Sequence, residues 1–237
     1  MKHRLRGADI LRAFRVTLPV MAGYVVLGIG FGILLESRGF GLLWSLAMGL
    51  FLYAGSMQYL MVDLLASGAS LLVTALTTLA VQARHLFYGI SMIEKYRGAG
   101  KRKPYMIFAL TDETYSLHCA EDGQKAAEPH AYLFLISLFD HVYWVVGCVL
   151  GSLIGTLIPF DMTGIDFALT ALFVTIFVEQ WRSSSRHLPA VIGATSSLLS
   201  LLIFGPDAFL IPAMLLIVFL LLLLRRRVGR REDASDA

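Results

Sequence analysis

The stretch LLVTALTTLAVQARHLFYGISMI, residues 71–93, decides the fold, because almost every position in it suits a membrane span. Its apolar length is sufficient for a helix to cross a hydrocarbon core about 30 Å thick. The exceptions are Arg84 and His85, which stand side by side inside it. A cationic side chain near the bilayer centre costs roughly 2.5–3.5 kcal/mol on insertion scales, so this pair indicates a functional site that needs a partner elsewhere in the chain.

The whole chain has the composition of an integral membrane protein. Of its 237 residues, 57% are hydrophobic and only 16% are charged, and the mean hydropathy is +0.71. These values lie outside the range of an ordinary soluble domain. We predict an all-α integral membrane protein: a bundle of about six to eight transmembrane helices in a single membrane domain over residues 1–237.

Basic residues flank the bundle at both ends. Five precede the first span within residues 1–15, and five follow the last span within the tail, residues 225–237. The positive-inside rule therefore predicts that both termini are cytoplasmic and that residues 16–224 form the bundle. Charges that only flank spans offer no nucleic-acid-binding face, so no nucleic-acid partner is expected.

Neither cofactor nor metal chemistry is indicated by the sequence. The two cysteines, Cys119 and Cys148, predict neither a disulfide framework nor a thiolate metal site. The run Ala54–Gln58 lacks the trailing glycine of a G-x-S-x-G nucleophile motif. We expect no enzyme, and an intramembrane enzyme that uses Ser56 or His85 is an alternative.

The order of apolar segments conflicts with the charges between them. Eight segments occur, approximately at residues 17–36, 41–65, 69–93, 104–118, 130–157, 164–181, 188–204 and 207–224. If all eight cross, the basic loop Glu94–Lys103 lies outside, against the positive-inside tendency. If the third and fourth segments instead enter and return on the cytoplasmic side, six crossings remain and every basic cluster lies inside. We therefore expect one or two broken or re-entrant segments, which are tolerated where they are buried in protein or line a watery cavity.

Glycines suggest an internal repeat. An offset of 123 residues superimposes Gly28 on Gly151 and Gly32 on Gly155. Two related halves would be typical of secondary transporters, which bind their substrate near the interface of the halves. Chance matching of a frequent residue is the alternative explanation.

Polar residues form a stripe on the third segment. At about 100° per residue, Thr74, Thr78, Gln82 and His85 fall within an arc of roughly 80°, and Tyr88 lies beside it. Arg84 is at the edge of this stripe. The alternative is that the helix ends near Arg84 and that its side chain extends to the lipid headgroups.

The second segment contains a candidate helix break. Ser45, Gly49, Ser56 and Asp63 share one face, whereas Gln58 points away from it. A helix break at Ala54–Gly55–Ser56 is favoured because glycine weakens a helix. Such a break would change the direction in which Gln58 points and would expose backbone N–H groups to a ligand. An ordinary small-residue helix contact is the alternative.

Acidic residues of the fourth segment could compensate Arg84 and His85, and a further acid lies in the fifth. Thr111–Asp112–Glu113–Thr114 lies behind an almost wholly apolar run, which favours a buried position. The alternative is a surface helix whose acids only cap its N-terminus. In the fifth segment, Asp140 shares a face with small residues suited to close helix packing, and could be a proton carrier or a hydrogen-bonded packing residue.

Four motifs occur in the same order as in the AzlC family, which this chain resembles over roughly residues 16–180. They are Gly23–Gly32 (GYVVLGIGFG), Ala54–Gln58 (AGSMQ), Thr77–Thr78 with Arg84–Gly89 (RHLFYG), and Leu110–Tyr115 (LTDETY). Departures also occur. Gln82 stands where the family usually has Asn, and Met57 and Tyr59 replace the commoner Ala and Phe.

The resemblance implies the large subunit of a branched-chain amino acid exporter. It implies a small hydrophobic AzlD-like partner, efflux of leucine, isoleucine, valine and methionine, and coupling to protons. A zwitterionic substrate needs a cation, an acid or helix end, and an apolar pocket. The substrate-binding candidates are Arg84, Gly55, Ser56, Gln58, Gln82, Tyr88, Thr111 and Glu113, and the proton-coupling candidates are His85, Asp112 and Asp140. A passive channel for small polar solutes is the alternative transport function.

Overall fold

The computed structural model describes residues 6–121, 123, 126–157, 174, 177–178, 181–182, 187–205 and 209–224. All regular secondary structure in these residues is helical, which confirms the all-α prediction. The chain divides into two compact units, Met1–Leu169 and Thr170–Ala237, and each is described by itself. Most of the predicted segment 164–181 and the tail 225–237 lie outside the described residues.

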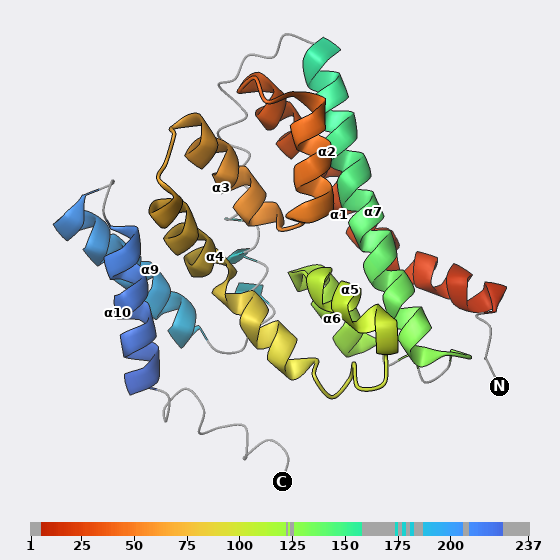
Figure 1. Ribbon diagram of the computed structural model, residues 1–237. Helices are drawn as coiled ribbons and strands as arrows, with labels where there is room; N and C mark the ends of the chain where they lie inside the picture. Colours follow the sequence, from red (N-terminus) through yellow and green to blue (C-terminus); the bar gives the residue numbers. More distant parts are fainter. Residues whose placement is uncertain are drawn as a thin grey trace. The chain divides into compact units, whose positions relative to one another are not determined.

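Two long parallel helices form the centre of the first unit (Figure 1). They are α1 (Gly7–Ser37) and α7 (Pro129–Leu157), and both are long and apolar enough to cross a membrane. Their direction follows from paired contacts. Thr17 bonds to Tyr143 near one end (3.1 Å between the hydroxyl oxygens), and Ser152 donates to Glu36 near the other (2.7 Å). We call the Thr17 end the N-terminal end of the unit and the Glu36 end its C-terminal end.

Glycines allow the backbones of α1 and α7 to touch. A Cβ added at Gly32 would lie 2.2 Å from the carbonyl oxygen of Cys148, and one added at Gly151 would lie 2.1 Å from that of Ile29. Real Cβ atoms essentially never approach so closely. The small-residue face predicted on the fifth segment is therefore confirmed as a helix seam, and the internal repeat stays a prediction.

The second segment is a helical hairpin, not one continuous helix. Helix α2 (Gly41–Phe51) descends beside α7, the chain turns at residues 52–54, and α3 (Gly55–Ala66) returns, as the V of α2 and α3 in Figure 1 shows. Arg38, just after α1, pairs with Asp63 near the end of α3 (3.3 Å). Both arms of this first hairpin thus begin and end at the C-terminal end of the unit. The predicted break at Ala54–Ser56 is confirmed. It divides the face that these residues were predicted to share, because Asp63 is exposed while Ser45, Gly49 and Ser56 are buried.

The third segment is one continuous helix, so the predicted break within it is wrong. Helix α4 (Leu71–Ser91) begins at Ser70, whose hydroxyl accepts a bond from the N–H of Val73. Its outer face is strongly apolar; Leu71 and Phe87 are 89% and 70% exposed. The helix continues past Arg84 because an i to i−4 ladder satisfies the backbone without help from other segments.

The fourth segment is a second helical hairpin. A short 3-10 turn, η1 (Gly100–Arg102), leads into α5 (Lys103–Phe108), and after residues 109–111 helix α6 (Asp112–Ala120) returns. Arg102 pairs with Glu128 and Arg12 with Glu121, so both arms start and finish at the N-terminal end of the unit. The two hairpins therefore enter from opposite ends and direct their tips toward each other.

This arrangement resolves the conflict between segments and charges. The first hairpin returns to its starting end, and α4 then carries the chain to the N-terminal end. The basic loop Glu94–Lys103 consequently lies at the same end as the basic start of α1, where Tyr96 and Ala99 pack in one cluster with Ala13. The predicted pairing of the third and fourth segments as one re-entrant unit is replaced by two separate hairpins.

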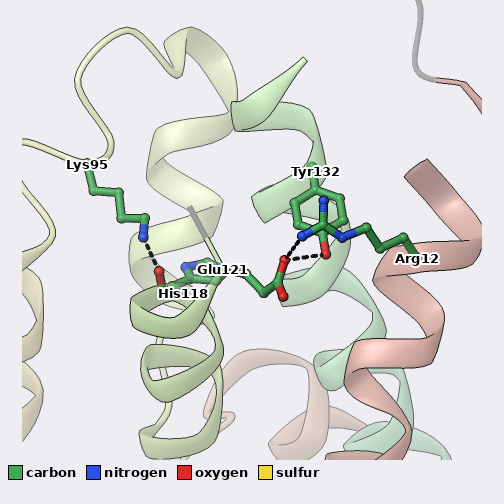
Figure 2. Close-up of polar contacts among 5 residues, drawn as sticks. All are labelled: Arg12, Lys95, His118, Glu121 and Tyr132. Carbon is green, nitrogen blue, oxygen red and sulfur yellow. Dashed lines mark hydrogen bonds and ion pairs between the residues drawn. The ribbon is translucent and has the colours of Figure 1, made fainter. Parts of the chain in front are cut away.

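Two ion pairs, Arg12–Glu121 and Arg102–Glu128, fasten the second hairpin to α1 and to the start of α7, and we call them the polar cap. Figure 2 shows the first of these pairs with its neighbours. The Glu121 carboxylate accepts bonds from Arg12 and from the Tyr132 hydroxyl (3.0 Å), and the Arg12 guanidinium lies 5.1 Å from the centre of the Tyr132 ring. Lys95 donates to the carbonyl oxygen of His118 near the outer end of α6. Burial lowers the pKa of His118 to about 4, so its ring is neutral at pH 7 and joins the loop to α7 through Tyr96 and Leu133.

The second unit contains α9 (Leu188–Phe204) and α10 (Leu210–Leu223), which contact each other. Both are apolar helices, as predicted for the last two segments. Gly205 ends α9 with φ +73°, a conformation that glycine adopts without a Cβ clash.

Candidate functional site

The tip of the first hairpin leaves a helix N-terminus open. Ala54, the N-cap of α3, has no side chain that could cap it, and no side-chain cap bond forms. The preceding residue, Tyr53, has φ +38°, which is unusual for a residue with a Cβ and typical of strain at functional turns. Gly55, Ser56 and Met57 are the first helical residues, so their N–H groups have no intrahelical acceptor. Helix N-termini of this kind favour anions.

Gln58 and Trp144 hold this tip in place. The Gln58 side-chain oxygen accepts the N–H of Ala54 (3.1 Å) and the indole N–H of Trp144 (2.8 Å). The side-chain nitrogen of Gln58 is fully buried and has no partner among the described residues. Trp144 also lies over Gly55, where an added Cβ would come within 3.2 Å of its ring. A single tryptophan of α7 thus determines both where the tip sits and why glycine begins α3.

The tip of the second hairpin carries acids at its helix N-terminus. Thr111 caps α6 by accepting the N–H of Thr114 (3.3 Å). The Tyr24 hydroxyl from α1 lies 2.5 Å from the Thr111 hydroxyl and donates to Glu113 (2.7 Å). Thr111 and Thr114 are buried, Asp112 is half-buried and Glu113 is exposed, so the predicted burial of this segment is confirmed for the threonines and is wrong for Glu113.

Asp140 on α7 is the buried acid beside this tip. The Thr114 hydroxyl donates to its Oδ2 atom (2.7 Å). Its Oδ1 atom has no partner among the described residues, although the side chain is fully buried. A buried acid that keeps one acceptor free is uncommon, since buried polar atoms are nearly always bonded.

Tyr53 brings the two tips together. Its ring lies 6.5 Å from Tyr24, 6.2 Å from Phe108 and 4.2 Å from His141, measured between ring centres. Its buried hydroxyl faces those of Tyr24 and Thr114 and lies within electrostatic range of Asp140 and Glu113. We call the set that surrounds the meeting tips the tip cluster: Tyr24, Tyr53, Gln58, Thr111, Glu113, Thr114, Asp140 and Trp144.

The two tips differ in charge. The start of α3 is uncapped and carries no acid in its first turn, whereas the start of α6 is capped by Thr111 and has Asp112 and Glu113 there. The first tip is therefore suited to an anionic group, and the second, with Asp140 behind it, to a cationic one.

The polar stripe of α4 reaches this region through α6. The Tyr88 ring stacks on Tyr115 (4.5 Å between ring centres), and the His85 ring meets the edge of Tyr88 (5.7 Å). Gln82, His85 and Tyr88 are half-buried. The side chain of Arg84 lies outside the described residues, so its predicted pairing with Asp112 or Glu113 stays a prediction.

The structure thus places the predicted residues in two groups. One group lies at the two tips or, for the α7 residue Asp140, beside them: Gly55, Ser56, Gln58, Thr111, Asp112, Glu113 and Asp140. The other group lies on α4: Gln82, His85 and Tyr88. Sequence reasoning missed Tyr24, Tyr53, Thr114 and the role of Trp144. Tyr24 belongs to the glycine-rich motif Gly23–Gly32 and Thr114 to the acidic motif Leu110–Tyr115. Membership of these motifs could have indicated both residues. Among the described residues, no group of three or more His, Cys, Asp or Glu side chains could hold a metal ion.

Comparisons with known proteins identify sequence relatives of this chain. The family model described as "AzlC protein" matches residues 19–158, a range that includes most of α1, both hairpins and α4, and α7. The chain is similar to the branched-chain amino acid transport protein AzlC of Bacillus subtilis, with 40% identity over 90% of this chain and 85% of that protein. No solved structure matches.

Two further relatives are described as membrane proteins. An uncharacterized membrane protein of Haemophilus influenzae is 39% identical over 85% of this chain and 83% of its own length. The inner membrane protein YgaZ of Escherichia coli is 27% identical over 89% of this chain and 86% of its own length. The similarity therefore extends well beyond the tip cluster.

Proposed function

The chain belongs to the AzlC family, and we propose that it is the large membrane subunit of a secondary transporter that exports branched-chain amino acids. The substrates are leucine, isoleucine, valine and methionine, and the location is a bacterial inner membrane with both termini in the cytoplasm. A small hydrophobic AzlD-like protein is the proposed partner. The observation that carries this proposal is the meeting of an open helix N-terminus with a buried acid at the tips of two opposed hairpins.

The two tips match the two charges of an amino acid. The substrate carboxylate binds the first-turn N–H groups of α3 at Gly55 and Met57, assisted by the side-chain nitrogen of Gln58, which has no partner among the described residues. The ammonium group binds at the second tip, where Asp140 has a free oxygen. Arg84, on α4, supplies a cation for the carboxylate.

An apolar wall stands beside the first tip. Phe31 lies 5.7 Å from Tyr59 and 6.4 Å from Trp144, between ring centres, and Met57 is fully buried. These side chains provide the apolar surface that a branched aliphatic side chain needs, and burial of each methylene contributes about 0.8 kcal/mol.

The opposed hairpins support alternating access. Each hairpin can move against α1 and α7 from its own end, so one can open while the other stays closed, as in transporters with discontinuous helices. The polar cap joins the second hairpin to α1 and to the start of α7, so its ion pairs must break when this hairpin moves. We propose proton coupling, with His85, Asp112 and Asp140 as the candidate carriers.

Amino-acid efflux from cells tests the proposed function. Cells fed leucine-containing peptides should retain more leucine when this gene is deleted and recover export when it is expressed with an AzlD-like small hydrophobic protein. Unchanged leucine and valine efflux after deletion would overturn the proposal. Efflux that persists after the proton gradient is collapsed would favour a passive channel, and conversion of a substrate by the pure protein would favour an enzyme.

Gln58→Ala is expected to lower this export at least about tenfold. The change removes the acceptor of two N–H groups, those of Ala54 and Trp144, and an orphaned buried donor costs about 1–3 kcal/mol, where 1.4 kcal/mol corresponds to a factor of ten. Radiolabelled leucine efflux at matched protein levels measures the effect.

A double-mutant cycle separates positioning from general damage. Trp144→Phe removes one of the two donors, so Gln58→Ala should cost less in that background than in the wild type. Ser67→Ala, at the exposed end of α3, is the matched control and should export normally. Equal losses in both backgrounds would show that Gln58 does not act through Trp144.

A further inference from the structure

We propose that Asp140 is a single site that a proton and the substrate's ammonium group occupy in turn, an inference that rests on the proposed function. Its two oxygens have different surroundings. Thr114 donates to Oδ2 at 2.7 Å, whereas Oδ1 is buried and has no partner among the described residues. One oxygen is thus held in place while the other stays available to a ligand.

The surroundings of Asp140 contain no compensating cation within the described part of the chain. Glu113 faces it from α6, Tyr24 from α1, Tyr53 from the first tip and Tyr143 from its own helix. The one charged group among these, Glu113, is itself an acid. A buried carboxylate without a paired cation is strongly disfavoured, so it must take up a proton or bind a cationic ligand. Both candidate occupants therefore neutralise the same charge.

Neighbouring titratable groups are already engaged. The Glu113 carboxylate accepts the Tyr24 hydroxyl and is exposed. His141 uses Nε2 to donate to the Gly49 carbonyl (3.1 Å) and Nδ1 to accept from Tyr105 (2.8 Å), so both of its ring nitrogens are occupied. Asp140 differs from them because it combines full burial with a free oxygen.

Exchange at one carboxylate couples export to protons. When the ammonium group of leucine binds, the protonated carboxyl releases its proton and the resulting carboxylate pairs with the ammonium; when leucine leaves, a proton returns. The site holds either a proton or the ammonium group of leucine but not both, so leucine moves outward as a proton moves inward.

Proton release on leucine binding tests this inference. The purified chain with its small partner is titrated with leucine at pH 6 in two buffers of different ionisation enthalpy, and calorimetry gives both the binding and the protons released. We expect about one proton released per leucine bound, falling toward zero as the pH is raised and the carboxyl is already ionised. Asp140→Asn should release none, and Asp63→Asn, an exposed acid of α3, should behave as the wild type.

The wild-type protein alone can also refute the inference. 4-Methylpentanoate, which is leucine without its amino group, should release no proton. Leucine binding without proton release at any pH from 5 to 8 would overturn the shared site while leaving the proposed function in place. Absence of leucine binding would overturn the proposed function itself, and with it this inference.

Discussion

Gly32→Ala is expected to remove most of the folded protein from the membrane. The added Cβ would lie 2.2 Å from the carbonyl oxygen of Cys148 and 2.5 Å from the N–H nitrogen of Ser152. Both atoms are backbone of α7, so no side-chain rotation can relieve the clash and the two central helices must separate. Overpacking of this kind costs about 3 kcal/mol, and every element that positions the tip cluster rests on this seam. The midpoint of thermal unfolding in detergent, followed by size-exclusion chromatography, measures the loss.

Gly23→Ala is the matched control for this seam. Gly23 lies in the same helix, and nothing stands within 4 Å of a Cβ added there. Because alanine favours a helix over glycine by roughly 1 kcal/mol, this variant should unfold at the wild-type temperature or slightly above it. Equal behaviour of the two variants would show that α1 and α7 do not make the close contact described here.

Arg84→Ala is expected to lower branched-chain amino acid export by roughly a hundredfold, or about 2.7 kcal/mol, while the protein still reaches the membrane. Arg84 precedes His85 on the continuous helix α4, and His85 is linked through Tyr88 and Tyr115 to the helix that carries Thr114. A hydrogen bond that involves charged groups contributes about 1.5–3 kcal/mol, and the substrate carboxylate would lose one in this variant. Leucine efflux at matched protein levels is the measurement.

Arg97→Ala separates this role from a general effect of charge. Arg97 is exposed and pairs with Glu94 three residues away, so its loss should leave export near the wild-type level. Arg84→Lys keeps a cation and should recover part of the export. Normal export by Arg84→Ala would remove Arg84 from the site, and loss of the protein from the membrane would assign it a structural role.

Local sequence signals predicted parts of the site correctly. Glycine and serine at Gly55–Ser56 mark a helix break because glycine weakens a helix and serine can satisfy freed backbone groups, and the break is where they predict it. The Thr111 cap and the acids that follow it are an equally local pattern. The expectation of a break in the third segment, α4, was wrong. It was inferred from the side of the membrane on which the basic loop Glu94–Lys103 should lie, and that side depends on how many of the earlier segments cross.

The sequence by itself determined that this protein is a helical membrane protein of a known family, since apolar length, flanking charges and ordered motifs are properties of the chain alone. The tertiary structure decided which segments are continuous helices and which form hairpins, because hydropathy records removal from water without distinguishing lipid from protein. It also decided that Tyr24, Tyr53 and Trp144 belong to the site. The hydrogen bond of Tyr24 to Glu113 joins residues 89 positions apart, and that of Trp144 to Gln58 joins residues 86 positions apart. Only the packing of α1 and α7 around the two hairpins brings such distant groups within hydrogen-bond distance.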